Sequence, residues 1–285
     1  MTAAASALLA FALLPQPADA ATTTWVPPQN ARWQYQLSAT STGSGTAGGI
    51  TISPCKTPYT GGACVSPQVY DIDLYAPDGK TVNTAAVTAI HKAGAKAVCY
   101  VDAGTWEDWR PDAASYPASV RGAAVDGWEG ENWLDVSKTS VLLPLIEARV
   151  AKCANGGFDA VEFDNVDGYD NNSGFPLTSA QQITFNKAIA GLAHKYSLSA
   201  ALKNDLAQVS SLVSSFDFAV NEQCQAYTEC AGLNPFLSAG KAVFQVEYTD
   251  DGGSASAACP AANSAGRSAI TKELALTASP WTPCR

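Results

Sequence analysis

Residues 157–164 read as a short buried strand that carries two carboxylates on one of its faces. Side chains alternate between the two faces of a strand, so Val161 and Phe163 point one way while Glu162 and Asp164 point the other. Burying carboxylates is unfavourable unless they are paired or used in chemistry. A solvated acidic turn is the plain alternative, but Glu162 lies inside the strand. We therefore expect an α/β protein whose site lies at the C-terminal end of this strand.

Strand-like stretches alternate with helical patterns along most of the chain. We expect helices over residues 82–93, 139–153, 178–196, 206–214 and 234–240. We expect strands over residues 33–37, 69–75, 95–101, 133–136, 157–164, 198–202, 216–220 and 242–248. Short apolar strands separated by helices are typical of a parallel sheet covered by helices. Eight such strands in 285 residues favour a TIM-like (β/α)8 barrel with a single domain.

The first 20 residues are interpreted as a signal peptide, although no Lys or Arg precedes the apolar run. An apolar run over residues 3–14 precedes Ala18-Asp19-Ala20, a small-x-small cleavage pattern. We therefore expect residues 1–20 to be removed and residues 21–285 to form one secreted, extracellular domain. No later segment reaches the roughly 20 apolar residues that a membrane span needs.

Eight cysteines follow this segment, and an even number in an exported chain indicates disulfides. Sequence proximity suggests the pairs Cys55–Cys64, Cys224–Cys230 and Cys259–Cys284. A Cys99–Cys153 bridge is feasible if Tyr100 points into the barrel, because Cys99 then faces the helices. The cysteines show no zinc-binding spacing, and we expect neither a metal nor a cofactor.

The chain is acidic, with 17 Lys and Arg against 26 Asp and Glu. Loss of Asp19 with the signal peptide leaves 25 acids and a net charge of −8. Such a surface repels nucleic acid and anionic membranes and attracts cationic partners. Simple solubility of an exported protein is the alternative explanation. We expect a monomer that binds neither nucleic acid nor membranes.

Polar side chains gather where the expected strands end. They are Asp71, Asp73, Tyr100, Asp102, Asp135, Glu162, Asp164, Lys203, Asn204, Asn221, Glu222 and Glu247. In a barrel the C-terminal strand ends meet at one mouth. Any one of these residues could be a helix cap or a satisfied core acid, but seven strand ends together favour a site. An aromatic and charged loop containing Trp106, Trp109, Trp128 and Glu131 would flank this mouth, although tryptophan is also common in cores.

A mouth rich in carboxylates, without a Ser/His/Asp set, suits glycoside hydrolysis. One carboxyl group protonates the leaving oxygen, and the other attacks the sugar or activates water. Aromatic faces in the flanking loop could stack on sugar rings.

Several stretches carry a family resemblance when they are taken in order. They are residues 70–73, 106–112, 127–135, 157–169, 202–205, 221–224 and 247–248. Together they resemble glycoside hydrolase family 114, the endo-α-1,4-polygalactosaminidases, over residues 33–248. The segment after residue 250 lies outside the resemblance.

The resemblance implies a TIM-like barrel that cleaves α-1,4-linked galactosamine in secreted polysaccharide, such as a biofilm exopolysaccharide of the galactosaminogalactan type. The family's catalytic acids fall on Asp164 and Glu222. The expected substrate-binding set is Asp71, Asp73, Tyr100, Trp106, Glu131, Glu162, Asn165, Asp167, Lys203, Asn204, Asn221, Glu247 and Tyr248. Deacetylated galactosamine carries an ammonium group on each sugar, so an acidic mouth would attract it.

Two other functions remain open at this point. A secreted barrel could bind polysaccharide without hydrolysing it. A calcium-binding protein could use Asp164, Asp167 and Asp170, although their spacing does not fit the EF-hand loop. Within the catalytic pair, Asp164 ends a buried strand and suits a nucleophile, while Glu222 opens a longer loop and suits a general acid. The two roles could be exchanged, and we favour a retaining mechanism.

Overall fold

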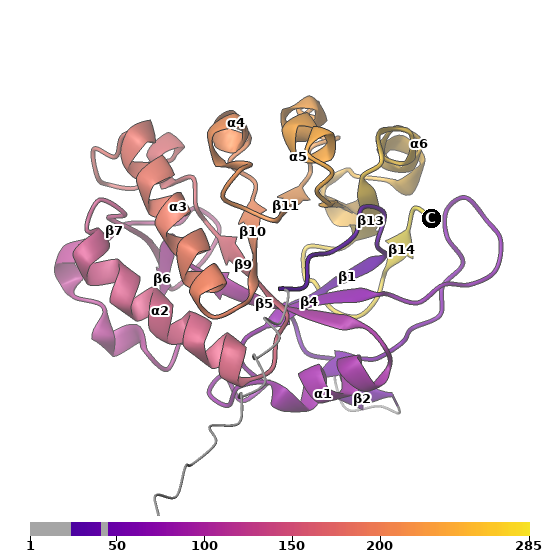
Figure 1. The fold of residues 1–285 in the computed structure, drawn as a ribbon, viewed down its shortest axis with the longest axis horizontal. Helices are drawn as coiled ribbons and strands as arrows, with labels where there is room; N and C mark the ends of the chain where they lie inside the picture. Colours follow the sequence, from indigo (N-terminus) through magenta and orange to yellow (C-terminus); the bar gives the residue numbers. More distant parts are fainter. Residues whose placement is uncertain (1–23, 41–44) are drawn as a thin grey trace, which may run out of the picture.

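A nine-stranded sheet forms the centre of the protein in the computed structural model, which describes residues 24–40 and 45–285 (Figure 1). The expected signal peptide lies outside the described residues. In sheet order, the strands are β1 (Trp33–Gln36), β4 (Val69–Asp73), β5 (Lys96–Asp102), β9 (Ala160–Asp164), β10 (Ser199–Lys203), β11 (Phe218–Glu222), β12 (Val243–Tyr248), β13 (Ser268–Lys272) and β14 (Thr282–Pro283). The pairings from β1 round to β13 are all parallel, and β14 pairs antiparallel with β13.

Side chains join the first and last parallel strands, β1 and β13. Trp33 Nε1 donates to the carbonyl of Ser268 at 2.8 Å, and Lys272 Nζ donates to Gln34 Oε1 at 2.8 Å. Trp281 Nε1 donates to the carbonyl of Trp33 at 3.0 Å. The sheet is therefore a nearly closed barrel, which confirms the expected TIM-like fold.

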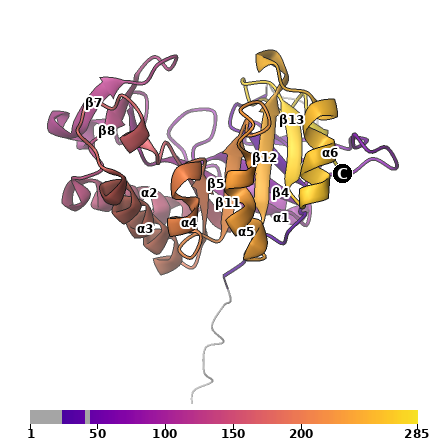
Figure 2. The same ribbon diagram turned by 90° about the horizontal axis from the view of Figure 1, so that it is seen from above.

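Helices cover the outside of the barrel, as Figures 1 and 2 show. They are α1 (Thr84–Lys92), α2 (Thr139–Asn155), α3 (Ser179–Lys195), α4 (Val209–Leu212), α5 (Asn234–Ser238) and α6 (Ala255–Ala265). Thr178 caps α3 and forms a reciprocal capping box with Gln181, which explains why this helix begins where the sequence predicts. In the described part of the chain, no helix has the length and apolar character needed to cross a membrane.

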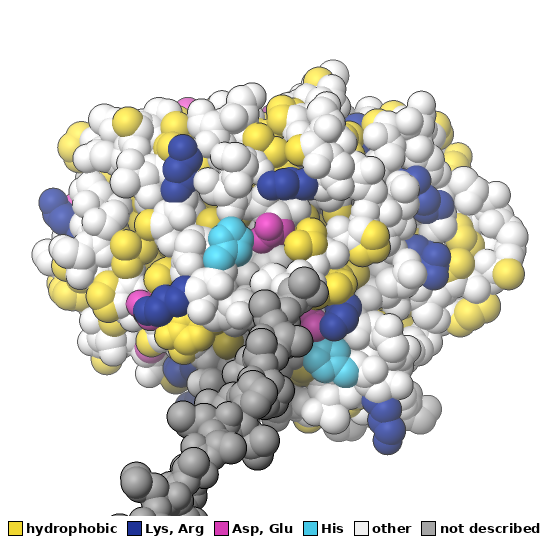
Figure 3. Space-filling model, in the orientation of Figure 1, with side chains coloured by type: hydrophobic (Ala, Val, Ile, Leu, Met, Phe, Trp, Pro, Cys, Tyr) yellow, Lys and Arg dark blue, Asp and Glu magenta, His cyan; other side chains and the backbone are white. Residues whose placement is uncertain are grey.

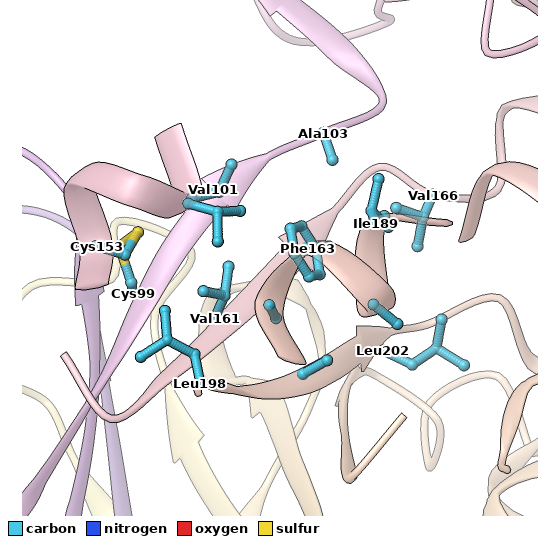
Figure 4. Packing of buried hydrophobic residues seen from close by; sticks show 14 of the residues in the cluster. Cys99, Val101, Ala103, Cys153, Val161, Phe163, Val166, Ile189, Leu198 and Leu202 are labelled. Carbon is cyan, nitrogen blue, oxygen red and sulfur yellow. A yellow bond between two sulfur atoms is a disulfide. The ribbon is translucent and has the colours of Figure 1, made fainter. Parts of the chain in front are cut away.

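Strand alternation sorts the buried side chains into two layers. Val161 and Phe163 face outward and pack with the Cys99–Cys153 disulfide and residues of α2 and α3 (Figure 4). Trp33, Tyr35, Val98, Ala160, Phe218, Val220 and Phe244 fill the barrel interior. Glu162 and Asp164 share the inner face with Ala160, as the alternation predicts.

The expected strand at residues 133–136 is not a barrel strand. It falls on β8 (Glu131–Leu134), which pairs antiparallel with β6 (Thr105–Glu107) and β7 (Arg121–Ala124) in a separate sheet. In Figure 2, β7 and β8 stand apart from β12 and β13. The eighth parallel strand is instead β13, in the C-terminal segment. Its sequence, Ser-Ala-Ile-Thr-Lys, has one large apolar residue and therefore gives a weak strand signal.

All four expected disulfides are present: Cys55–Cys64, Cys99–Cys153, Cys224–Cys230 and Cys259–Cys284. Cys99–Cys153 links β5 to α2. Two short strands, β2 (Thr46–Ala47) and β3 (Ile50–Thr51), form a hairpin beside α1.

Both histidines lie on the face shown in Figure 3. His91 contacts Asp159 at 2.7 Å, and His194 contacts Asp217 at 2.8 Å. The two aspartates immediately precede β9 and β11, so this face is the N-terminal end of the barrel. The histidines therefore lie at the opposite end of the barrel from Asp164, and each contacts the aspartate that precedes a strand.

Candidate active site

Lys203 bridges two carboxylates at the C-terminal mouth of the barrel. Its Nζ lies 3.1 Å from Asp164 Oδ1 and 2.8 Å from Glu222 Oε2. The three residues end the neighbouring strands β10, β9 and β11. Because both oxygens contact one ammonium, they are no more than about 5.9 Å apart, the sum of 3.1 and 2.8 Å. Burial alone would lower the pKa of Lys203, but the charges of Asp164 and Glu222 outweigh it and hold that pKa well above its usual range.

Asp164 is held by three donors from three different segments. Besides Lys203, the hydroxyl of Tyr100 donates to Oδ2 at 2.8 Å. The backbone N–H of Asn165 donates to Oδ1 at 2.8 Å, and Asn165 itself has a φ of 57°, in the left-handed region. Charge-assisted bonds of this kind fix the position of a carboxylate.

Glu222 is held in a similar way from its two neighbouring strands. Tyr248, which ends β12, donates a short hydrogen bond to Oε1, while Lys203 on β10 holds Oε2. Asn204 Oδ1 accepts from the backbone N–H of Glu222 at 3.0 Å and from Asn221 Nδ2 at 3.1 Å. Asn204 thereby links the C-terminal ends of β10 and β11.

Two further carboxyl groups, Asp71 and Glu162, lie in the layer below and are fully buried. Tyr35 donates to Glu162 Oε1 at 3.1 Å. Both Asp71 oxygens and Glu162 Oε2 are buried without a hydrogen-bond donor among the described residues. Burial raises the pKa of Asp71 to about 7 and, together with the charge of Asp71, raises that of Glu162 well above its usual range. A proton held between the two carboxyls would supply the missing donor.

A cavity of about 220 Å³ opens directly above the pair formed by Asp164 and Glu222. Of the residues predicted for the site, it is lined by Tyr100, Glu131, Asp164, Asn165, Asp167, Lys203, Asn204 and Glu222. Burial is the main cause that raises the pKa of Glu131 to about 7 and that of Asp167 to about 6. The cavity is therefore a pocket with four carboxyl groups in its walls.

Other lining residues were not in the predicted set. Trp128 is 57% exposed at the cavity wall, and its aromatic loop had already been noted in the sequence. Tyr35 lies near the C-terminal end of β1, as Tyr100 lies near the C-terminal end of β5. Leu274 and Leu276 also line the cavity but come from the C-terminal segment, which carried no recognisable signal.

Several predicted residues lie outside this cavity. Asp73 pairs with Arg110 at 2.8 Å, and the indole N–H of Trp106 donates to the carbonyl of Ala113 at 3.0 Å. Asn221 is buried and accepts from the backbone N–H of Cys224 at 3.2 Å.

Glu247 lies on β12 but points away from the barrel interior. Val246 and Tyr248 take the inner positions of this strand, so alternation turns Glu247 outward. Its carboxylate accepts from the backbone N–H groups of Gln225 at 2.9 Å and Ala226 at 3.2 Å. Glu247 therefore fixes the loop after β11.

Three buried acids, Asp102, Glu107 and Glu131, bring their carboxylate oxygens within 4.8 Å of one another. Arg110 already pairs with Glu107 at 2.7 Å. Asp102 accepts from the backbone N–H of Thr105 and from Asn165 Nδ2, both at 2.8 Å. The cluster is thus supplied with a cation and with donors from the protein, and its chemistry fits a structural link between the three-stranded sheet and the mouth better than a metal site.

A family model and a solved structure each match nearly the whole chain. The model of glycoside hydrolase family GH114 matches residues 14–285, so the match includes the C-terminal segment, which lay outside the resemblance found in the sequence. The crystal structure of Aspergillus fumigatus Ega3 in complex with galactosamine is 32% identical, and the match covers 91% of this chain and 97% of Ega3, with a TM-score of 0.76.

A more distant structure is similar in fold. The glycoside hydrolase domain of PelA from Pseudomonas aeruginosa is 14% identical and has a TM-score of 0.56, with 74% of this chain and 88% of that chain covered. Curated protein sequences gave no match. The family match over nearly the whole chain and the similarity to Ega3 lead to one conclusion: this chain belongs to glycoside hydrolase family 114.

Proposed function

We propose that this protein is a secreted, endo-acting hydrolase that cleaves α-1,4-linked galactosamine in galactosamine-rich polysaccharide, with Asp164 and Glu222 as its catalytic pair. The family membership supports glycoside hydrolysis, and the galactosamine bound in Ega3 supports the sugar. Four disulfides support an extracellular location, because such bonds persist in oxidising compartments.

One observation carries the assignment of the catalytic pair: Lys203 contacts both carboxylates at once. The two oxygens are therefore at most about 5.9 Å apart, a limit that accommodates the separation of about 5–5.5 Å that is typical of retaining enzymes. This upper limit is below the separation of about 6.5–9.5 Å that leaves room for water in inverting enzymes. The pair therefore suits a retaining mechanism.

The two steps follow from this arrangement. Asp164 attacks the anomeric carbon while Glu222 gives its proton to the glycosidic oxygen, which leaves with the rest of the chain. Glu222 then takes a proton from water, the water oxygen attacks the same carbon, and Asp164 is released. Tyr100, Tyr248 and Lys203 hold the two carboxyl groups in position.

The walls of the cavity suit an amino sugar. Glu131 and Asp167 add two carboxyl groups to the catalytic pair, and a sugar ammonium would compensate their charges. Trp128 offers an exposed aromatic face, which can pack against the apolar face of a sugar ring.

The test is hydrolysis of a partly deacetylated α-1,4-galactosamine polymer, followed by mass spectrometry of the products. The wild type should release oligosaccharides of several lengths, and Asp164→Asn and Glu222→Gln should each lower kcat at least about 10²-fold. Both substitutions keep shape, so binding should change little. A wild type that binds the polymer and releases no product would instead be a polysaccharide-binding barrel.

A further inference from the structure

A short segment after β13 forms one wall of the active-site cavity. Leu274, Ala275 and Leu276 line this cavity together with the proposed catalytic pair. We call residues 274–277 the C-terminal strap. The strap adds an apolar surface to a cavity whose other walls hold four carboxyl groups.

The strap keeps a backbone conformation that leucine rarely adopts. Leu276 has a φ of 45°, in the left-handed region, where the side chain of a bulky residue is crowded by its own backbone. Its side chain is nevertheless buried and forms part of the cavity wall. Such a conformation persists only where surrounding contacts impose it, and it is most frequent at functional sites. The strap is therefore held in place by its neighbours and not by its own preference.

Two of these neighbours are exposed groups on other strands' C-terminal loops. Asp250, which follows β12, accepts from the backbone N–H of Leu274 at 3.1 Å. The backbone N–H of Ser38, which follows β1, donates to the carbonyl of Leu276 at 3.1 Å. Both Asp250 and Ser38 are exposed to water, which competes for the same hydrogen bonds.

Lys272, the last residue of β13, holds the strap from below. Its Nζ donates to the carbonyl of Thr277 at 2.7 Å and to Oε1 of Gln34 at 2.8 Å. The Lys272 side chain is 1% exposed, and no carboxylate in the described part of the chain pairs with it. Burial lowers its pKa to about 7. A buried ammonium without a counter-ion is unfavourable for folding, so stability does not explain why a lysine occupies this position.

Closure of the barrel does not explain this lysine either. Neutral hydrogen bonds from the indole groups of Trp33 and Trp281 already join the strands at the seam between β1 and β13. A methionine at residue 272 would fill similar space without the cost of burying a charge. The lysine differs from it by offering a charged donor to the strap, and such hydrogen bonds are stronger than neutral ones.

We propose that Lys272 is a positioning residue for substrate binding, which holds the C-terminal strap so that Leu274 and Leu276 form an apolar wall for the sugar chain. This inference rests on the proposed function and concerns binding, not the chemical step. Lys272 does not line the cavity, so it acts through the strap. Without its ammonium, Leu276 can relax from the left-handed conformation, and the wall loses its shape.

The experiment compares Lys272→Met with the wild type by thermal unfolding and by steady-state kinetics on a fully deacetylated oligomer. Methionine removes the buried charge, so the melting temperature should equal or exceed that of the wild type. KM should rise about tenfold while kcat stays within about twofold, because the wall contacts the substrate equally before and during the chemical step.

Lys241→Met is the matched control. Lys241 is a half-buried lysine that also donates to two carbonyls, those of Val213 and Phe216, but it precedes β12 and lies at the N-terminal end of the barrel. The control therefore removes a lysine of the same kind far from the strap, and its KM should equal that of the wild type.

A double-mutant cycle with Leu274→Ala tests whether Lys272 acts through the strap. Leu274 is 43% exposed, so its truncation leaves the core intact, and it should raise KM by itself. In the double variant the KM should equal that of Lys272→Met alone, because the displaced strap no longer presents residue 274 to the substrate.

Three results would overturn the inference. An unchanged KM in Lys272→Met, or a variant that does not fold, would make Lys272 a purely structural residue. An unchanged KM in Leu274→Ala would show that the strap does not contact the substrate. Effects on KM that multiply in the double variant would show that Lys272 acts independently of the strap. Absence of any cleavage by the wild type would be a different outcome, because it would refute the proposed function itself and this inference with it.

Discussion

The hydroxyl of Tyr35 lies 3.1 Å from Oε1 of Glu162, inside the barrel and one layer of side chains below Asp164. This contact is part of a polar floor that Asp71 completes from the neighbouring strand β4. Lys203 is close enough for its charge to act on both acids of the floor. The floor therefore shares one cation with the proposed catalytic pair, and its protonation state influences the charge around that pair.

The floor should make stability depend on pH. The pKa of Asp71 is raised from 3.8 to about 7 in the folded protein, so between these pH values the folded state binds more protons than the unfolded state. The contribution of Asp71 to the free energy of unfolding is therefore largest below about pH 4 and is lost as the pH rises through 7. Asp71→Asn removes that loss, and we expect its melting temperature to exceed that of the wild type at pH 8 but not at pH 4.

Thermal unfolding from pH 4 to pH 8 measures this effect. The groups that act on Asp71 are Glu162, Lys203 and Asp164, and all three are retained in the variant. Asp78→Asn is a suitable control because Asp78 is an exposed acid outside the barrel, with its pKa lowered to about 2 by hydrogen bonds from Thr81. Parallel curves for the wild type and Asp71→Asn would show that the floor does not hold an extra proton.

Trp128 should contribute to substrate binding more than to the chemical step. Its ring is 57% exposed at the wall of the active-site cavity, so Trp128→Ala should raise KM about tenfold with a small change in kcat, as expected for about 1.4 kcal/mol of lost stacking. Tyr59→Ala is the matched control, because Tyr59 is 46% exposed and does not line the cavity. Steady-state kinetics on a fully deacetylated oligomer separates the two constants. An unchanged KM in Trp128→Ala would remove this residue from the binding surface.

Period-two patterning explains how much of the fold could be predicted. In β9 the apolar residues Val161 and Phe163 alternate with acids, so both the strand and its orientation were readable from the sequence. In β13 Ile270 is the one large apolar residue, and small or polar residues occupy the other positions, so the local pattern could not identify this strand. The short strand β8 has a similar local pattern to a barrel strand, and only its tertiary pairing with β6 and β7 excludes it from the barrel.

The sequence predicted those site residues whose position depends only on where a barrel strand ends. Asp164, Lys203 and Glu222 end neighbouring strands, and the barrel geometry brings them together. Glu247 also lies near a strand end, but the sequence does not say which face of β12 points into the barrel. Gln245 and Glu247 lie on one face, Val246 and Tyr248 lie on the other, and either face could point inward. Contributions from the C-terminal segment, such as Leu276, depend on how a loop folds back over the mouth.

The disulfides should differ in their contribution to stability. Cys99 and Cys153 are 54 residues apart, whereas Cys224 and Cys230 are 6 apart. In the chain-entropy description, removing the first bridge by a double Cys→Ala change costs about 4 kcal/mol, and removing the second costs about 2 kcal/mol. Denaturant unfolding should therefore rank the two double variants in this order. The Cys224–Cys230 double variant should lose more activity for each kcal/mol of lost stability, because that bridge closes the loop after β11 that carries Tyr227. A larger relative loss of activity in the Cys99–Cys153 double variant would contradict a role for this loop.

Lys203 should be needed both for folding stability and for catalysis. Replacing it by methionine leaves Asp164 and Glu222 within about 5.9 Å without the ammonium that now separates their charges. Loss of one partner from a buried ion pair typically costs about 3–5 kcal/mol, so Lys203→Met should lower the melting temperature clearly, and it should lower kcat at least about 10²-fold. Lys187→Met, an exposed position on α3, should change neither quantity. Circular dichroism and product release at a temperature where Lys203→Met is folded separate the two effects. Near-normal kcat in the folded variant would show that the Lys203 ammonium stabilises the fold but is not needed by the catalytic pair.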